Sequence, residues 1–214
     1  MEINPEEALD EKTQFLANTI YDLRQDLDLH RVIALNHTSM KEMNFSGAFF
    51  GRVQQLALFS IAINFPKLFE IERGFELCSI PAILSKLPDS QIGDEQVQYF
   101  KEFEEKTGFD LIHKHGKIGV QSALEQFKSK NDVSLIQLKT YRDKAGAHLE
   151  YPAPSGKIPS HQKLEEMWTF ANCFYQLVHK VYNNVNPALM GAQTSIGLKK
   201  TLERLGLKDV ELFF

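Results

Sequence analysis

Residues 160–181 read SHQKLEEMWTFANCFYQLVHKV, and their apolar spacing indicates the fold class of the chain. The apolar residues recur three or four positions apart, at Leu164, Met167, Trp168, Ala171, Phe174, Val178 and Val181. This spacing forms one face of an α-helix, so a long amphipathic helix is predicted, with Ser160 as its N-cap. Such a helix is stable only when other apolar surfaces cover that face.

Two further long helices are predicted upstream. The first begins at Asn4-Pro5 and runs to about Asn36, with Leu9, Leu16, Ile20, Leu23 and Leu27 at helical spacing. The second begins near Ser46 and is apolar on most sides, as the central helix of a bundle would be. Pro66 is expected to kink this helix or to end its first part.

Shorter helical patterns fill most of the remaining chain. They lie at residues 79–87, 94–106, 120–128, from Asp132 onward, and at 198–205. Strand-like alternation and internal repeats are both missing from the sequence. The prediction is therefore an all-α single domain over residues 1–214, a bundle of about five principal helices plus short ones. Its core is expected to include Leu16, Ile20, Leu23, Phe59, Leu135, Trp168 and Phe174.

Composition indicates a soluble globular protein of the cytoplasm. Hydrophobic residues make up 43% of the 214 residues and charged residues 24%. The acidic start of the chain does not resemble a signal peptide. Polar residues interrupt the most apolar run, at 53–65, so no membrane span is expected. Cys78 and Cys173 lie in apolar helical patterns and are predicted to be buried free thiols.

Charge is unevenly distributed along the chain. The formal net charge is -4, but residues 111–148 contain 7 Lys and Arg against 3 Asp and Glu. Residues 1–110 contain 10 against 19. A local basic surface on an acidic protein can bind phosphates selectively. The alternative is that the basic and acidic stretches face each other in the fold.

The sequence contains none of the well-marked catalytic motifs, such as a Walker loop, GxGxxG, HExxH or GxSxG. His113-Lys114-His115 offers two imidazoles, but no Asp, Glu or Cys cluster accompanies them. We therefore predict no cofactor and no metal site. His161 and His179 belong to the last long helix and are expected at its surface.

The remaining candidate is the segment at residues 141–151, YRDKAGAHLEY. Arg142 and His148 are six positions apart, which places them about 240° apart around an ideal helix. A straight helix would therefore not bring them together. Either Gly146 distorts the helix, or the two side chains meet partners from another chain. In a purely structural role, Arg142 pairs with Asp143 and His148 caps the helix end.

This segment resembles the Arg-polar-spacer-His signature of HEPN domains (higher eukaryotes and prokaryotes nucleotide-binding). FPKLFE at residues 65–70 and SIPAILSKL at residues 79–87 make the layout similar to the abortive-infection AbiU type. The resemblance covers roughly residues 10–185 and leaves 186–214 as a C-terminal extension.

The resemblance implies a homodimer in which two Arg/His motifs share one cleft. It further implies a metal-independent RNA endonuclease, a toxin or antiviral defence effector, with Arg142, Asp143 and His148 as catalytic residues. Lys139, Tyr141, Lys144 and Tyr151 are the candidate RNA contacts. A partner antitoxin or defence-system protein is plausible from the same resemblance. The alternative is a non-catalytic module that binds RNA or nucleotides or supports assembly.

Overall fold

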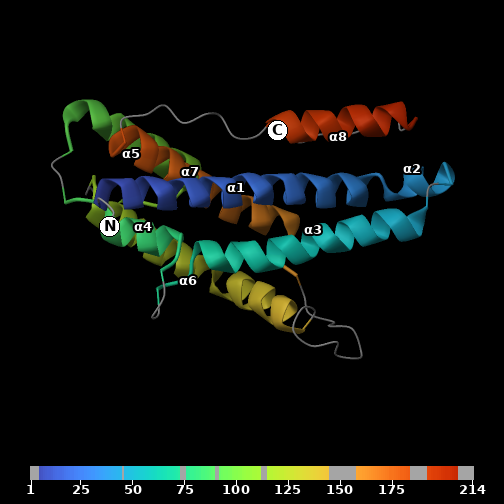
Figure 1. Cartoon of the computed structure of the whole chain (residues 1–214), viewed down its shortest axis with the longest axis horizontal. Helices are drawn as coiled ribbons and strands as arrows, with labels where there is room; N and C mark the ends of the chain where they lie inside the picture. Colours follow the sequence, from blue (N-terminus) through green and yellow to red (C-terminus); the bar gives the residue numbers. More distant parts are fainter. Residues whose placement is uncertain are drawn as a thin grey trace.

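The structure is a computed structural model, and it describes residues 5–44, 46–72, 76–89, 92–111, 115–144, 158–183 and 192–206. Eight helices and no strands lie within these ranges, which confirms the predicted all-α class (Figure 1). The helices are α1 (Pro5–Leu35), α2 (His37–Glu42), α3 (Gly47–Leu68), α4 (Ile80–Lys86), α5 (Asp94–Thr107), α6 (Lys117–Arg142), α7 (His161–Val181) and α8 (Ala192–Arg204).

The long helices pack as a bundle around α1 and α7. The helix α3 returns beside α1 in the opposite direction after the short α2, and α6 crosses α3 (Figure 1). The helix α7 packs against α1 and α5, while α8 lies along another side of α1. Among the described residues, no helix combines the length and the apolar character needed to cross a membrane.

Local sequence signals set most of the helix boundaries. The hydroxyl oxygens of Ser46, Ser79 and Ser160 each accept a hydrogen bond from a backbone N–H in the first turn of α3, α4 and α7. Such caps satisfy donors that the helix itself leaves unpaired. Gly108 ends α5 in the left-handed conformation, at a φ of 69°. Pro66 does not stop α3, which continues to Leu68.

The segment at residues 117–142 forms one helix, so the two separate helices predicted there are wrong. The sequence-based prediction takes Asp132 as the cap of the second helix. Instead, the side-chain amide of Asn131 is buried and donates a hydrogen bond to the carbonyl of Phe127, four residues earlier. This bond joins two residues of the same helix, so the side chain does not cap a new helix and the backbone hydrogen bonds continue past Asn131. The helix α6 consequently runs without interruption to Arg142.

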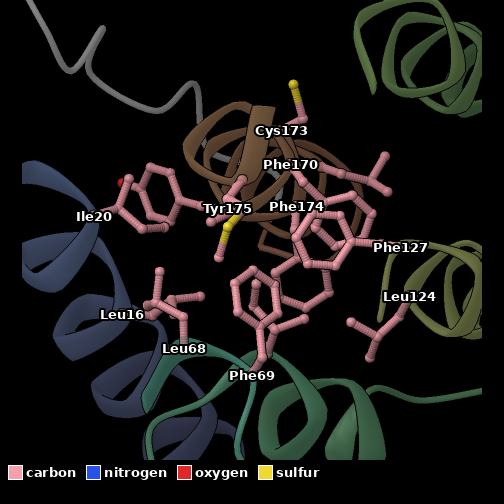
Figure 2. Close-up of a cluster of buried hydrophobic side chains, with 14 of the residues drawn as sticks. Leu16, Ile20, Leu68, Phe69, Leu124, Phe127, Phe170, Cys173, Phe174 and Tyr175 are labelled. Carbon is pink, nitrogen blue, oxygen red and sulfur yellow. The ribbon is translucent and has the colours of Figure 1, made fainter. Parts of the chain in front are cut away.

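Aromatic rings form the centre of the core. Phe127 of α6 stacks on Phe170 of α7 at 4.2 Å between ring centroids, and Phe69 stacks on Phe127 at 4.6 Å (Figure 2). Phe103 and Phe109 meet Phe170 edge to face. Both arrangements are favoured by aromatic quadrupoles. The core therefore joins α5, α6, α7 and the end of α3.

The predicted core is largely correct, with some exceptions. Leu16, Ile20, Leu23 and Phe174 are completely buried. Leu135 and Trp168 are partly buried against the core, and the indole N–H of Trp168 donates to the carbonyl of Ile20. Phe59, however, is only half-buried.

The prediction that α3 is the central helix of the bundle is wrong. Phe49 and Leu56 on this helix are 61% and 51% exposed. The helix with the most complete burial on its apolar face is α7.

Two further predictions of exposure are corrected. Cys173 is buried as predicted, but Cys78 is exposed because it precedes α4 in a loop. His179 is buried rather than at the surface, with 8% of its area exposed, and its ring lies against Tyr175. His161 is only partly exposed. Helical spacing alone does not show that α1 and α5 both pack against α7 and so cover positions that would otherwise face solvent.

Removing the central ring of the aromatic core should destabilise the fold strongly. Phe170→Ala leaves a cavity between Phe127 and Phe103, and we expect a loss of about 3–5 kcal/mol in the free energy of unfolding. The measurement is urea unfolding followed by circular dichroism. Ile118→Ala, at a side chain that is 64% exposed, is the matched control and should change stability by less than about 0.5 kcal/mol.

Stability should fall as the pH drops below about 6.5, the ordinary histidine value. Burial lowers the pKa of His179, with the charge of Asp10 opposing this shift in part, and burial also lowers the pKa of His30. The unfolded chain therefore takes up these protons at a higher pH than the folded chain, so acidification favours unfolding.

Urea unfolding between about pH 7.5 and pH 5.5 tests this dependence. His179→Phe, which keeps a ring at the site, should make the dependence shallower. His37→Gln, at an exposed side chain, should leave it as it is. An equally steep profile in His179→Phe would contradict the assignment of this effect to His179.

Candidate functional site

The last turn of α6 presents the basic residues of the candidate site. Lys139 and Arg142 lie in this turn, where positive charge interacts favourably with the helix dipole. The backbone N–H of Asp143 still bonds to the carbonyls of Lys139 and Thr140, and residues 143–144 form a wider π-type turn. The regular helix therefore ends directly after Arg142.

Arg142 is held between two carboxylates. Its Nε donates a 2.8 Å hydrogen bond to Oδ1 of Asp143, and its Nη1 lies 3.8 Å from Oε1 of Glu70. The side chain of Arg142 is 32% exposed, and that of Asp143 is 60% exposed. Ion pairs between partly exposed groups contribute little to stability, so these partners can be exchanged. The planar guanidinium also suits bidentate contact with a phosphate.

Residues later in the loop that follows α3 hold the backbone of Glu70 in position. The hydroxyl of Ser79 donates a 2.7 Å hydrogen bond to the backbone carbonyl of Glu70. Lys12 of α1 reaches the same loop and donates to Oε1 of Glu72 and to the carbonyl of Leu77, both at 3.0 Å. These partly buried bonds hold Glu70, Glu72 and Leu77 in position.

Lys12 remains a cation although its side chain is only 6% exposed. Burial alone would lower its pKa, but the contacts with Glu72 outweigh this effect and raise the pKa. The pKa of the Glu72 carboxyl is lowered first by the hydrogen bond from the backbone N–H of Leu77 and then by the contact with Lys12. The loop is therefore anchored to α1 by a charged pair, and Glu70 is placed opposite Arg142 as a result.

A groove of about 440 Å³ lies between this loop and α6. Its walls are formed by Phe69, Glu70, Ile71, Leu77, Lys128, Asp132, Leu135, Ile136 and Lys139. Lys128 and Lys139 are three helical turns apart and therefore share one face of α6. Burial lowers the pKa of Lys128, and the positive charge of Lys139 lowers it further. The groove thus combines two lysines and two carboxylates, those of Glu70 and Asp132, with apolar side chains.

The structure brings together part of the predicted site. Arg142, Asp143 and Lys139 lie at one end of α6, and Lys144 is exposed beside them. Tyr141 is half-buried against the core, where burial raises its pKa. His148 and Tyr151 lie outside the described residues.

Two residues of this surface were not predicted as site residues. Glu70 belongs to the segment FPKLFE, but nothing in the sequence showed that it faces Arg142. Lys128 shares a helical face with Lys139, eleven positions later. This relation becomes visible only when residues 117–142 are recognised as one helix.

The described residues contain no group of three or more His, Cys, Asp or Glu side chains that could hold a metal ion. The chemistry available at the end of α6 is therefore that of a guanidinium, two carboxylates and nearby lysines. Such groups bind phosphate and stabilise negative charge on it.

Comparison with known proteins identifies the family. The family model HEPN_AbiU2, described as AbiU2, matches residues 6–204 of the chain. No curated protein and no solved structure matches the chain. The matched range contains both carboxylates around Arg142 and the whole of α6. The chain therefore belongs to the AbiU2 family of HEPN proteins, the abortive-infection type.

Proposed function

We propose that the chain is a metal-independent RNA endonuclease of HEPN type, with an active site composed of Arg142 and His148 at a homodimer interface. The observation that carries this proposal is the position of Arg142. Its guanidinium lies at the end of α6, partly exposed, and is oriented by Asp143 and Glu70. Membership of the AbiU2 family supports the same reading.

The reaction requires no group beyond the side chains and the RNA. The 2′-hydroxyl attacks the adjacent phosphorus, the bond to the 5′-oxygen of the next nucleotide breaks, and a 2′,3′-cyclic phosphate remains. His148 serves as the proton-transfer group at the attacking or the leaving oxygen. Arg142 stabilises the negative charge that develops on the phosphate oxygens. Asp143 keeps the guanidinium in position through its bond to Nε.

The groove beside Glu70 suits the approach of a single RNA strand to Arg142. Lys139 and Lys128 are the cations for backbone phosphates. The less exposed apolar residues Phe69, Leu77 and Leu135 accommodate unstacked bases, which leaves the exposed Ile71 and Ile136 for contact with a second protomer. The carboxylate of Asp132 lies in the same groove, so it opposes binding of a continuous line of phosphates. Two separate phosphate contacts, one at Lys128 and one at Lys139, fit this distribution of charge.

Association of two protomers near this surface is supported by exposed apolar side chains. Ile71 and Ile136 both line the groove, and they are 62% and 54% exposed. Exposed apolar groups that lie together on a surface are typical of interaction sites. His148 lies outside the described residues. Whether the His148 that acts with Arg142 comes from the same chain or its partner is therefore decided by complementation.

One observation favours the alternative, a non-catalytic module that binds RNA or nucleotides. The positive charge of Arg142 is balanced by Asp143 and Glu70, which is also the expected arrangement for a structural arginine. In that case the groove would bind RNA without cleaving it. In either case the proposed setting is a cytoplasmic toxin or antiviral effector, with an antitoxin or defence-system protein as partner.

The proposed reaction is tested by incubating RNA with the protein in EDTA. The wild type should cleave RNA to 2′,3′-cyclic phosphate ends and leave DNA intact, because DNA lacks the attacking hydroxyl. His148→Ala should lower the rate on the order of 10²–10⁴-fold. Arg142→Ala should lower it on the order of 10²–10³-fold. Arg52→Ala, at an exposed arginine of α3, is the matched control and should retain full activity.

Each other outcome has a defined meaning. Cleavage that persists in both variants places the active site elsewhere. RNA binding without cleavage by the wild type, lost in Arg142→Ala, supports the non-catalytic alternative. A strict requirement for magnesium contradicts the proposed mechanism. Circular dichroism must show equal helical content in all variants.

A composite site predicts complementation between two inactive variants. When Arg142→Ala and His148→Ala proteins are mixed and allowed to exchange protomers, mixed dimers contain one intact Arg/His pair only if the pair spans both chains. Statistical exchange should then restore about a quarter of the wild-type activity. No recovery, despite exchange shown by labelled protomers, would mean that each site lies within one chain.

The dimer itself is tested by light scattering, against a protomer mass of 24.5 kDa. Ile71→Glu combined with Ile136→Glu should shift the protein toward the monomer, because charges at the apolar contact oppose association. Ile118→Glu introduces the same charge at an exposed isoleucine near the start of α6, and it should leave the dimer intact. A wild type that is monomeric at micromolar concentration contradicts the composite site.

A further inference from the structure

A second cleft lies on elements that the Arg142 surface does not use. It is about 490 Å³ in volume and lies between the last turns of α1 and the first turns of α7. Its lining residues are His30, Arg31, Ala34, Leu35, His161, Gln162 and Glu165. Five of these seven residues are polar or charged, and three of them carry or accept positive charge.

The carboxylate in this cleft is already neutralised from one side. Arg24 of α1 donates to both oxygens of Glu165, at 2.7 and 2.8 Å, and also bonds to Asp28. Burial alone would raise the pKa of Glu165, but its contacts with His161 and Arg24 lower the value to about 2. The guanidinium of Arg24 is further held over the ring of Trp168 at 5.0 Å. Glu165 therefore offers little free negative charge to the cleft.

The two histidines differ in their surroundings. Nε2 of His161 lies 2.9 Å from Oε1 of Glu165. Both ring nitrogens of His161 are buried, and neither makes a well-formed hydrogen bond within the described part of the chain. An unsatisfied buried polar atom requires an explanation, and a missing ligand is one of the few available.

The carboxylate that lines the cleft with His30, that of Glu165, is already paired with Arg24 and His161. Burial lowers the pKa of His30, and repulsion by the imidazole of His161 lowers it further. A bound anion would relieve this repulsion and favour protonation of His30. Arg31 and the N-terminal end of α7, with its positive dipole, add to the same potential.

We infer that the cleft between α1 and α7 is a binding site for a phosphate group, contacted by His30, Arg31 and His161. Its volume exceeds that of a bare phosphate, so the group arrives as part of a nucleotide or of an RNA strand. Ala34 and Leu35, the latter 50% exposed, form the apolar wall on which a sugar or base can rest. The inference does not depend on cleavage at Arg142.

Binding should strengthen as the pH falls from about 7.5 to about 6, because His30 then gains a proton that the anion stabilises. The charged groups that face it are Arg24, Asp28 and Arg31 of α1 and His161 and Glu165 of α7. From α3, the neutral side chain of Gln54 bonds to the carbonyl of His30.

The test follows the imidazole NMR resonances of His30 and His161 at constant ionic strength. The probes are inorganic phosphate, a 5′-nucleotide monophosphate and a single-stranded RNA oligomer. The protein carries Arg142→Ala and His148→Ala together, so that RNA is not cleaved and failure of the proposed function does not affect the result. Saturable shifts at both histidines are expected, with a raised titration midpoint for His30.

Variants connect these shifts to the cleft. His161→Gln and Leu35→Glu should each weaken binding of the nucleotide or RNA by about tenfold or more, since one removes a cation and the other adds an anion. Leu35→Glu changes an exposed side chain, so it tests the site even where His161→Gln disturbs the Arg24 network. His37→Gln, just beyond α1 and not part of the cleft, is the matched control and should bind normally.

The three probes separate the sources of the phosphate. Tighter binding of RNA than of the nucleotide indicates a strand-binding site, and the reverse indicates a nucleotide site; both support the inference. Shifts that sodium chloride reproduces at equal ionic strength would overturn it. So would equal weakening in the His37→Gln control.

Discussion

The stack of Phe69, Phe127 and Phe170 lies at the centre of the core and joins three parts of the chain. Phe127 brings α6 onto α7, and Phe69 adds the residue directly after α3 to the same stack. Glu70 follows Phe69 in the chain, so the stacked ring determines where its carboxylate emerges. The charged pair of Lys12 and Glu72 then holds Glu72 against α1. The contact between Glu70 and Arg142 is a consequence of this packing and not its cause, because a pair at 3.8 Å that is one-third exposed contributes little.

The sequence predicts features that depend on neighbouring residues and misses those that depend on distant ones. Ser46, Ser79 and Ser160 cap helices through bonds to residues three positions away, so their patterns are read correctly. Gly108 ends α5 for an equally local reason. The continuity of α6 through Asn131 depends on burial of that side chain, which no local pattern shows. Likewise, Glu70 and Arg142 are 72 positions apart, and only the packing of α3 against α6 places them together.

Both readings of the uneven charge distribution are partly correct. Two cations of the basic segment 111–148 lie near carboxylates of the acidic first part, Lys117 near Asp89 and Arg142 near Glu70. Lys128 and Lys139, in contrast, line the groove, where their mutual repulsion contributes to lowering the pKa of Lys128. Glu70 and Asp132 line the same groove, so its two lysines are accompanied by two carboxylates.

The two proposed anion-binding surfaces lie at the two ends of one connecting segment. Residues 143–160, which include His148, join the end of α6 at Arg142 to the start of α7 at His161. At each end, a guanidinium is held by one nearby carboxylate and one that is distant in the sequence. Arg142 is held by Asp143 and Glu70. Arg24 is held by Asp28 and Glu165. The two pairs differ in burial: the side chain of Arg24 is 13% exposed and that of Arg142 is 32% exposed. Buried pairs resist exchange because a lone charge is costly there, whereas exposed pairs exchange readily. Arg24 therefore stays with its carboxylates beside the cleft between α1 and α7, whereas the ion pairs of Arg142 are the more exposed of the two.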